Sequence, residues 1–563
     1  MKIAFTGNTF GRTSSDELIT GYNVAAEGLL KAFMRYGKAD EHLFLCEPSQ
    51  YQEDAIRRFA NHEAVLSARK KIELINEYDL LFHGVDRLKD VDILHSIKED
   101  VLPLLSMRER IGKPIPITFT FHSLSEPHLI WDTFIPMLML PFKPYDAMIC
   151  TSDAVVRFMQ NIFERLQKTF CDNSLTLGMP KLRLEKVNLG IDTDYFHPLE
   201  KTGLREKYKI PQNAFVILWF GRFSDCFKAD LFPLLHIFQK LIREFPYKNL
   251  MLILAGSQER GANYTAVLKE QITNLGLENR VHIVFNDQIR DRAELYNIAD
   301  VFTSPADNIQ ETFGLTPIEA MSCGIPQVVS DWDGYRDTVE HGVTGFRIHT
   351  AWCDCLNDIS AIDYLPANVG SRRMLHAYLS AHSVAVDCTD YLEKLKLLVS
   401  DCDLLKKMSV NSRERAIRYY DIRHTVERTE SVWEDLIRIA NSDKSGFHPK
   451  GIPAIDYCHD FSGYPTEMLD DSTPFEPTVF CTRENFYKTP CCNRNVIKES
   501  EIPPQIIEYI TKVGTVPIKQ IIAVFEKYSP DQVKRALMLL YKYDFIKIGT
   551  GFSMQSTLCS DDE

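Results

Sequence analysis

The chain has 563 residues, 45% of them hydrophobic and 25% charged, which is the usual balance of a globular protein large enough for several domains. Its formal net charge of −13 argues against a surface that binds nucleic acid over most of its area. No apolar run is long enough to cross a bilayer, the first residues form no secretory signal, and fourteen scattered cysteines favour reduced thiols, so we expect a cytoplasmic protein.

Residues 1–200 alternate short apolar runs with helical patterns, which predicts a parallel sheet covered by helices. Strands are expected at residues 2–6, 43–46, 91–94, 115–121 and 147–151, with a first helix at 24–36. The loop from Gly7 to Gly21 contains glycines of the kind needed where a backbone approaches a ligand closely. The pattern predicts one doubly wound α/β domain in this half.

Residues 201–412 restart the same alternation and predict a second doubly wound domain. Its strands are expected at residues 215–220, 250–255, 281–285, 301–304 and around 328–329, with a helix at 231–245. Residues 413–440 are helical in character throughout, so we expect a single long helix there.

The remainder of the chain is expected to hold a linker and a small domain. Residues 441–500 are rich in Pro, Asp, Ser and Cys, which indicates an irregular linker with partial order. Three short helical patterns and an apolar tail follow, so residues 503–551 look like an α+β winged-helix domain. Its candidate recognition helix, residues 531–543, carries only three cations, which favours contact with an acceptor protein or peptide, or a homodimer interface, over DNA binding.

The segment from Glu311 to Glu319 carries the strongest functional signal. Two carboxylates lie eight residues apart around a glycine-containing turn, and Pro317 falls in the first turn of a predicted helix, where its missing amide proton costs nothing. An anion is expected at the positive end of that helix. The backbone amides placed to hold it are those of Gly314, Leu315 and Thr316. A nucleotide sugar, with a phosphate flanked by hydroxyl groups, suits this layout.

This segment resembles the E-x7-E signature of retaining nucleotide-sugar glycosyltransferases of family four, which have the GT-B fold of two doubly wound Rossmann-like domains facing across a cleft. The resemblance implies that Glu311 holds hydroxyl groups of the transferred sugar, that Glu319 holds the ribose, and that the Gly314 and Leu315 amides hold the distal phosphate. It also implies that the helix at 413–440 braces the first, acceptor-side domain. The stretch at 346–387 is longer than the family usually needs.

Arg222 and Lys228 follow a predicted strand and resemble the family's Gly-Arg…Lys-Gly motif, although Ala229 replaces the last glycine. Lys228 is expected at the start of a helix. The resemblance implies that the two cations stabilise the charge that develops on a departing nucleotide diphosphate. The alternative is a basic pair on the surface with no catalytic role.

Three further residues are expected to line the cleft. His122 ends a strand and resembles a histidine that lies near the sugar and the acceptor, although a lone histidine is more often structural. Gly21 and Ser257 are the candidates for further donor contacts. The loop at 285–289 is where such enzymes contact the nucleobase, but it does not identify the base. His95 is a weaker candidate than His122.

The cysteines at 458, 481, 491 and 492, together with His459, suggest a zinc site. Their spacing fits no pair of C-x2-C knuckles, so free thiols are preferred.

We therefore expect a retaining glycosyltransferase that moves a sugar from a UDP- or GDP-linked donor to an unidentified acceptor, with no cofactor and no metal. Two alternatives stay open. The first is a catalytically silent GT-B scaffold that binds a nucleotide or a protein partner. The second is a nucleotide-sugar epimerase or a phosphorylase on the same fold.

Overall fold

The chain divides into two units, Met1–Ile452 and Pro453–Glu563. The structure is a computed structural model. It describes residues 1–6, 21–46, 57, 59, 61, 63–66, 70–76, 80, 85–97, 101–258, 263–285, 291–359, 369–444, 446–489 and 501–549.

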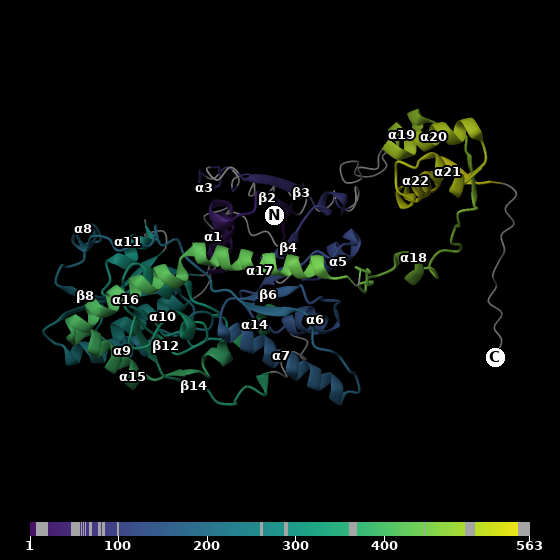
Figure 1. The fold of residues 1–563 in the computed structure, drawn as a ribbon. Helices are drawn as coiled ribbons and strands as arrows, with labels where there is room; N and C mark the ends of the chain where they lie inside the picture. The colour runs from purple at the N-terminus through teal and green to yellow at the C-terminus, as the bar shows by residue number, and fades with distance from the viewer. Residues whose placement is uncertain are drawn as a thin grey trace. The chain divides into compact units, whose positions relative to one another are not determined.

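A parallel sheet of seven strands, in the order β3-β2-β1-β4-β5-β6-β7, forms the first half of the first unit (Figure 1). The strands are β1 (Lys2–Thr6), β2 (Glu41–Cys46), β3 (Lys71–Asn76), β4 (Ile93–Ser96), β5 (Ile117–Thr120), β6 (Ala147–Cys150) and β7 (Arg183–Lys186). The helices with them are α1 (Gly21–Tyr36), α3 (Glu63–Leu66), η1 (Val85–Leu88), α5 (Val101–Ile111), η2 (Ile130–Phe134), α6 (Ile135–Met139) and α7 (Asp153–Asp172). All five predicted strands are present; β3 and β7 were not predicted.

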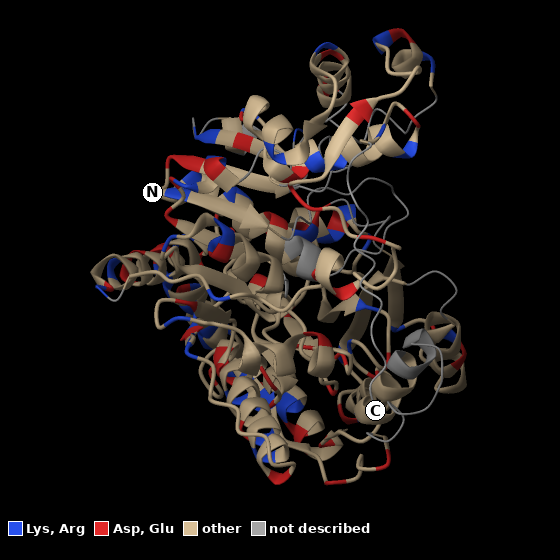
Figure 2. Ribbon diagram, turned by 90° about the vertical axis from the view of Figure 1, so that its right-hand side faces the viewer, with Lys and Arg blue, Asp and Glu red and all other residues tan. Residues whose placement is uncertain are grey.

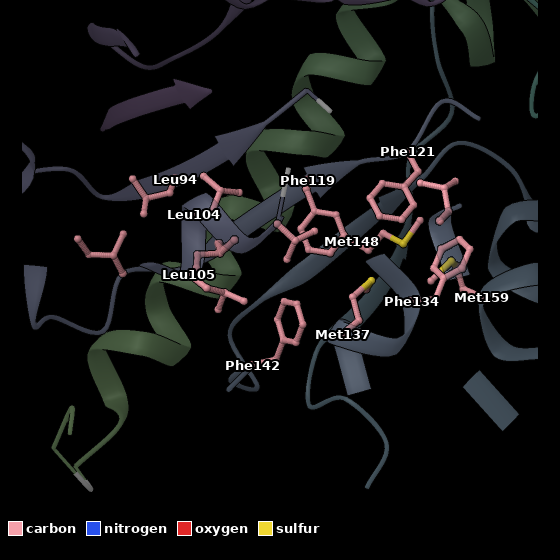
Figure 3. Packing of buried hydrophobic residues seen from close by; sticks show 14 of the residues in the cluster. Leu94, Leu104, Leu105, Phe119, Phe121, Phe134, Met137, Phe142, Met148 and Met159 are labelled. Atoms are coloured by element: carbon pink, nitrogen blue, oxygen red, sulfur yellow. The ribbon is translucent and has the colours of Figure 1, made fainter. Parts of the chain in front are cut away.

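The core of this half is built on the apolar strands in the middle of the sheet. Phe119 of β5 and Met148 of β6 are fully buried and pack with side chains from α5, α6 and α7. Figure 3 shows these residues converging on one layer between the sheet and the helices. The alternation of strands and helices in the sequence therefore produces the doubly wound packing that was expected.

A second parallel sheet, of six strands in the order β10-β9-β8-β11-β12-β13, forms the other half of this unit. The strands are β8 (Ala214–Arg222), β9 (Asn249–Ser257), β10 (Val281–Phe285), β11 (Val301–Ser304), β12 (Gln327–Ser330) and β13 (Gly345–Ile348). The helices are α8 (Lys201–Lys207), α9 (Phe232–Glu244), α10 (Tyr264–Asn274), α11 (Arg292–Asn297), α12 (Leu315–Ser322), α13 (Tyr335–Thr338), α14 (Val369–Ala381) and α15 (Cys388–Ser400). A short antiparallel pair, β14 (Thr350–Ala351) and β15 (Ala385–Val386), lies near the two ends of the long stretch at 346–387, which we call the predicted insertion.

The prediction of a single helix over residues 413–440 is wrong. The chain forms two helices there, α16 (Cys402–Tyr420) and α17 (Ile422–Ser442), that meet at Asp421. The Asp421 side chain accepts from the backbone N–H of Arg423, which caps α17. At this junction the chain also pairs with the segment that joins the two sheets: Ile191 N–H donates to Tyr420 O over 2.9 Å and Ile422 N–H donates to Ile191 O over 2.8 Å.

The two helices serve different halves. In α16, the Arg413 guanidinium donates to Ser322 O of α12 over 2.9 Å. In α17, Trp433 is fully buried, stacks on Phe33 of α1 and donates from Nε1 to Thr118 Oγ1 of β5 over 3.0 Å. Figure 1 shows α17 running past α1 and β6. The helix that braces the first sheet is therefore α17 alone.

The second unit contains three helices over the region predicted as a winged helix, α20 (Ile502–Val513), α21 (Ile518–Val524) and α22 (Pro530–Lys542), with strands β17 (Val516–Pro517) and β18 (Ile546–Ile548). The central strand of its antiparallel sheet is β16 (Pro474–Pro477), which lies inside the predicted linker, as do α18 (Tyr457–Asp460) and α19 (Arg483–Lys488). Phe475 of β16 is fully buried in this unit's core. The winged-helix assignment stays a prediction.

We predict that Gly190→Ala destabilises the first unit. A Cβ atom at Gly190 would lie 2.7 Å from Ile422 Cα and 2.9 Å from Ile422 N, so backbone must move to admit it. Overpacking of this kind costs on the order of 1–3 kcal/mol, and the midpoint of thermal unfolding should fall. Gly178→Ala is the matched control, because a Cβ atom there has open space within 4 Å. Equal midpoints for the two variants would contradict the tight junction.

Candidate functional site

A buried ion pair joins the turn before α9 to the loop before α12. Lys228 Nζ lies 2.5 Å from Glu311 Oε2 and 3.5 Å from the Tyr335 hydroxyl, and the two charged side chains are only 14% and 17% exposed. Burial alone opposes both charges, but Glu311 raises the pKa of Lys228, and Lys228 in turn lowers the pKa of Glu311. Both groups therefore stay ionised. Lys228 was expected at a helix start; it lies instead in the turn that precedes α9.

A fully buried asparagine fixes the position of that turn. Asn308 Nδ2 donates to Lys228 O over 2.7 Å, and Asn308 O accepts from Trp332 Nε1 over 2.7 Å. The same residue also holds the loop before α12 that carries Glu311, which we call the signature loop, because Asn308 Oδ1 accepts from Gln310 N–H over 3.0 Å. Three loops at one edge of the sheet are thus tied together by the side chain and the backbone carbonyl of one residue, which the sequence analysis did not identify.

Arg222 and Ser257 lie side by side at the carboxyl ends of β8 and β9. The strands approach closely there, since a Cβ atom at Gly256, where φ is 149°, would lie 1.6 Å from Gly221 O. The Arg222 guanidinium stacks 5.4 Å from the centre of the Phe227 ring, and its Nη2 lies 3.4 Å from Gln310 Oε1. The structure therefore brings Arg222 to the loop that carries Glu311.

The amino end of α12 has the geometry expected of an anion site. Gly314 precedes the helix with φ of 93°, and a Cβ atom there would lie 2.2 Å from the Tyr335 ring, so only glycine fits. The backbone amides of Leu315 and Thr316 begin the helix, and Pro317 follows them within its first turn. The positive end of the helix dipole thus lies beside the Lys228–Glu311 pair.

Glu319 is held within the fold more tightly than expected. It is 1% exposed, and its two oxygens accept from Arg292 Nη2 over 2.5 and 2.6 Å. Tyr296 also donates its hydroxyl to Glu319 Oε2 over 2.6 Å. The sequence analysis missed Arg292 and Tyr296; their spacing of four residues on one helix, which places them on the same face, was the available signal.

His122 follows β5 and is brought against the signature loop from the first sheet. Its backbone carbonyl accepts from Thr312 Oγ1 over 3.1 Å, while Thr312 O accepts from Ser152 Oγ over 2.7 Å. Burial lowers the pKa of the His122 imidazole to about 4, so it is neutral at physiological pH. His95 is also buried, and its Nδ1 lies 2.9 Å from Thr118 Oγ1, the atom that accepts from Trp433 in the bracing contact.

A cavity of about 250 Å³ opens beside these residues. The first sheet contributes Ser125, Glu126 and Pro127 to its lining, and the loops of the second sheet contribute Cys226, Phe227, Ile309 and Gln310. The remaining wall comes from the predicted insertion, through Leu356, Ile359, His376, Ala377 and Ser380. The insertion therefore lies at the cleft rather than away from it.

Some predicted contacts lie partly or wholly outside the described residues. Gly21 begins α1, but residues 7–20 of its loop and residues 286–289 of the nucleobase loop are not described. Cys491 and Cys492 are not described either. Within the described ranges, no group of three or more His, Cys, Asp or Glu side chains is placed to hold a metal ion.

Residues 200–359 match the family model of the glycosyl transferases group 1. The match spans most of the half that is built on the second sheet, including the segment from Glu311 to Glu319. The chain is 30% identical over 169 residues to the D-inositol 3-phosphate glycosyltransferase of Streptosporangium roseum, covering 30% of this chain and 38% of that protein. It is 28% identical over 230 residues to the enzyme of the same name from Xylanimonas cellulosilytica, covering 39% and 51%. The chain thus spans only part of the curated relatives it matches.

The structure is similar to that of Anabaena HepE solved in complex with UDP. The TM-score is 0.50 at 18% sequence identity, over 77% of this chain and all of HepE. This likeness supports the arrangement of two Rossmann-like halves.

Basic and acidic residues are mixed along the described elements. Figure 2 shows lysine and arginine interspersed with aspartate and glutamate along the elements that face the viewer. Among the described helices, none is both long enough and apolar enough to pass through a membrane.

We predict that Arg292→Ala destabilises the protein by on the order of 3 kcal/mol, because it leaves the buried Glu319 carboxylate without its cation. Arg336→Ala is the matched control: its ion pair with Asp331 is exposed, and its removal should cost less than about 1 kcal/mol. Thermal unfolding measures both variants. Similar small shifts would show that Glu319 does not depend on Arg292.

Proposed function

We propose that this protein is a retaining glycosyltransferase that transfers a sugar from a nucleotide-diphosphate sugar to an acceptor. The observation that carries the proposal is the Lys228–Glu311 pair beside the Gly314 turn at the amino end of α12. The match of residues 200–359 to the group 1 family model supports it, and so do the bound UDP of HepE and the glycosyltransferase activity named for the curated relatives.

The charges at the site suit a departing diphosphate. In the reaction, the bond between the anomeric carbon and the phosphate oxygen breaks, and negative charge grows on the nucleotide. Arg222, Lys228 and the amides that begin α12 are placed to stabilise that charge. Lys228 is paired with Glu311. A bound diphosphate would compete with Glu311 for Lys228, and the Glu311 carboxylate would then be available to hydroxyl groups of the sugar. Glu311 then orients the sugar so that the acceptor attacks the face that the nucleotide leaves.

The roles of His122, Gly21, Ser257 and Glu319 stay proposals of the same model. A neutral His122 fits hydrogen bonding to a sugar or acceptor hydroxyl group rather than charge stabilisation. Glu319 fits a ribose contact only through the lone pairs that Arg292 and Tyr296 leave, since two donor groups already make three hydrogen bonds to its oxygens. No side chain is proposed as a nucleophile, and no metal or cofactor is proposed.

We leave the donor base, the donor sugar and the acceptor open. The relatives' names specify D-inositol 3-phosphate, but the match covers only 38% of the first of them. The described cysteines carry free thiols, which supports the proposed cytoplasmic location.

The second candidate is a silent scaffold that binds a nucleotide without turnover. The intact set of Arg222, Lys228, Glu311 and Glu319 counts against it. Nucleotide release measured across UDP-, GDP- and ADP-linked sugars, with mass spectrometry to detect an acceptor adduct, separates the two. Binding without release for every donor would favour the scaffold.

We predict that Glu311→Gln impairs transfer of the sugar, whereas Lys228→Ala impairs binding of the nucleotide. If Glu311 orients the sugar, Glu311→Gln keeps the affinity for free UDP or GDP but lowers kcat/KM for transfer roughly tenfold or more. Lys228→Ala removes a charge-assisted contact with the phosphate and should weaken nucleotide binding by roughly ten- to a hundredfold. Calorimetry and initial rates measure both. A collapse of nucleotide affinity in Glu311→Gln with transfer retained would reverse the two roles.

We predict that removing the second unit spares the donor reaction. The deletion should start at Pro453, because a cut at residue 500 would separate β16 from the strands it pairs with. If the unit docks an acceptor protein or peptide or joins two copies, nucleotide release from the donor persists while acceptor transfer falls or the mass in solution changes. Two results together would contradict this role. The full chain would bind duplex DNA in a salt-sensitive manner and lose this binding on deletion, and the deletion would leave acceptor transfer and the mass in solution unchanged.

A further inference from the structure

The turn between β12 and α13 places a second carboxyl group beside the Lys228–Glu311 pair. Asp333 occupies this turn with φ of 34°, in the left-handed region that favours glycine. The turn packs directly on the signature loop, since a Cβ atom at Gly334 would lie 2.3 Å from Phe313 Cα. Trp332 fixes its other side by donating to Asn308 O over 2.7 Å. Asp333 is therefore held rigidly in an unfavourable backbone conformation.

The carboxyl group of Asp333 is incompletely satisfied. Its Oδ1 accepts from the Gly334 N–H, but its buried Oδ2 makes no hydrogen bond to any described residue. Burial raises the pKa of Asp333 well above its ordinary value, and the charge of Glu311 raises it further, against an opposing effect of Lys228. Tyr335, the other titratable group beside it, is itself buried and neutral, with a pKa of about 12. Burial and the charge of Glu311 thus both favour the protonated form of Asp333.

These features do not stabilise the fold. A glycine would adopt this φ without strain, and it would bury no polar atom. A buried polar atom without a partner costs free energy, and strained backbone of this kind concentrates where a ligand is bound. Asp333 lies close enough to Glu311, Lys228 and Tyr335 for their charges to influence one another, so the unsatisfied oxygen belongs to the same cluster as these three residues.

We propose that Asp333 is a further donor-binding residue, whose carboxyl group forms a hydrogen bond with a hydroxyl group of the transferred sugar next to Glu311. The inference rests on the proposed glycosyltransferase function. A neutral carboxyl group both donates and accepts, which matches a sugar hydroxyl group, whereas a second carboxylate beside Glu311 would repel it. Asp333 therefore contributes to the choice of sugar rather than to binding of the nucleotide.

The test compares Asp333→Gly and Asp333→Asn with the wild type. UDP-glucose, UDP-galactose, UDP-N-acetylglucosamine and GDP-mannose are the donors, and free UDP and GDP are the nucleotide probes. Asp333→Gly should lower kcat/KM for the preferred donor roughly tenfold and should reduce the ratio of this kcat/KM to the values for the other donors. The affinity for free UDP or GDP should stay within about twofold of the wild type. Asp333→Asn, which tolerates the same φ and keeps a donor and an acceptor, should recover most of the loss.

The control is Asp331→Asn on the same turn, because Asp331 pairs with Arg336 and Arg347 instead of facing the cluster. It should leave kcat/KM and sugar preference unchanged. Asp333→Gly should also be at least as resistant to thermal unfolding as the wild type. If the wild type is active and Asp333→Gly has the same kcat/KM and the same sugar preference, the inference about Asp333 is overturned but the proposed function is not. A wild type that releases nucleotide from none of the donors would remove the proposed function and this inference together.

Discussion

The buried ion pair between Lys228 and Glu311 is the constraint on which the site depends. Burying two charges is costly unless they pair at close range, so the turn before α9 and the loop before α12 must keep one spacing. The sheet allows this because β8 and β11 are neighbours. The chain winds from β8 toward β10 in one direction and from β11 toward β13 in the other. The site therefore lies at the point where the strand order reverses, the usual location of ligands in such sheets.

Packing around this pair explains why so many small or special residues gather nearby. Gly256 allows the ends of β8 and β9 to touch, and Gly314 makes room for the Tyr335 ring. Asn308 then joins the loops through its two side-chain groups. Each of these contacts restricts the conformations that the loops can adopt. The charged side chains and backbone amides of the site are therefore preorganised before a ligand binds.

Much of the fold followed from the sequence, because apolar strands such as β1 and β11 are short runs with clear boundaries. The strand β7 was missed since Arg183–Lys186 is polar and half-buried. The break at Asp421 was missed because helical periodicity continues on both sides of a residue that also caps a helix. At the site, the motif residues were recognised as separate signals. Their pairing, 83 residues apart along the chain, and the burial of Asp333 depend on tertiary packing that no local pattern contains.

The junction at Asp421 has a mechanical consequence. The chain passes between the two sheets twice, through the segment around Ile191 and at Tyr420–Ile422, and backbone hydrogen bonds hold these passages side by side. Because the two connections lie side by side, they form one short hinge. A rotation of one sheet relative to the other would have to occur about this hinge. A small change of angle at the hinge would produce a larger displacement at the end of the cleft that lies farthest from it. Gly190 packs closely against Ile422, so the backbone at this junction has little room to rearrange.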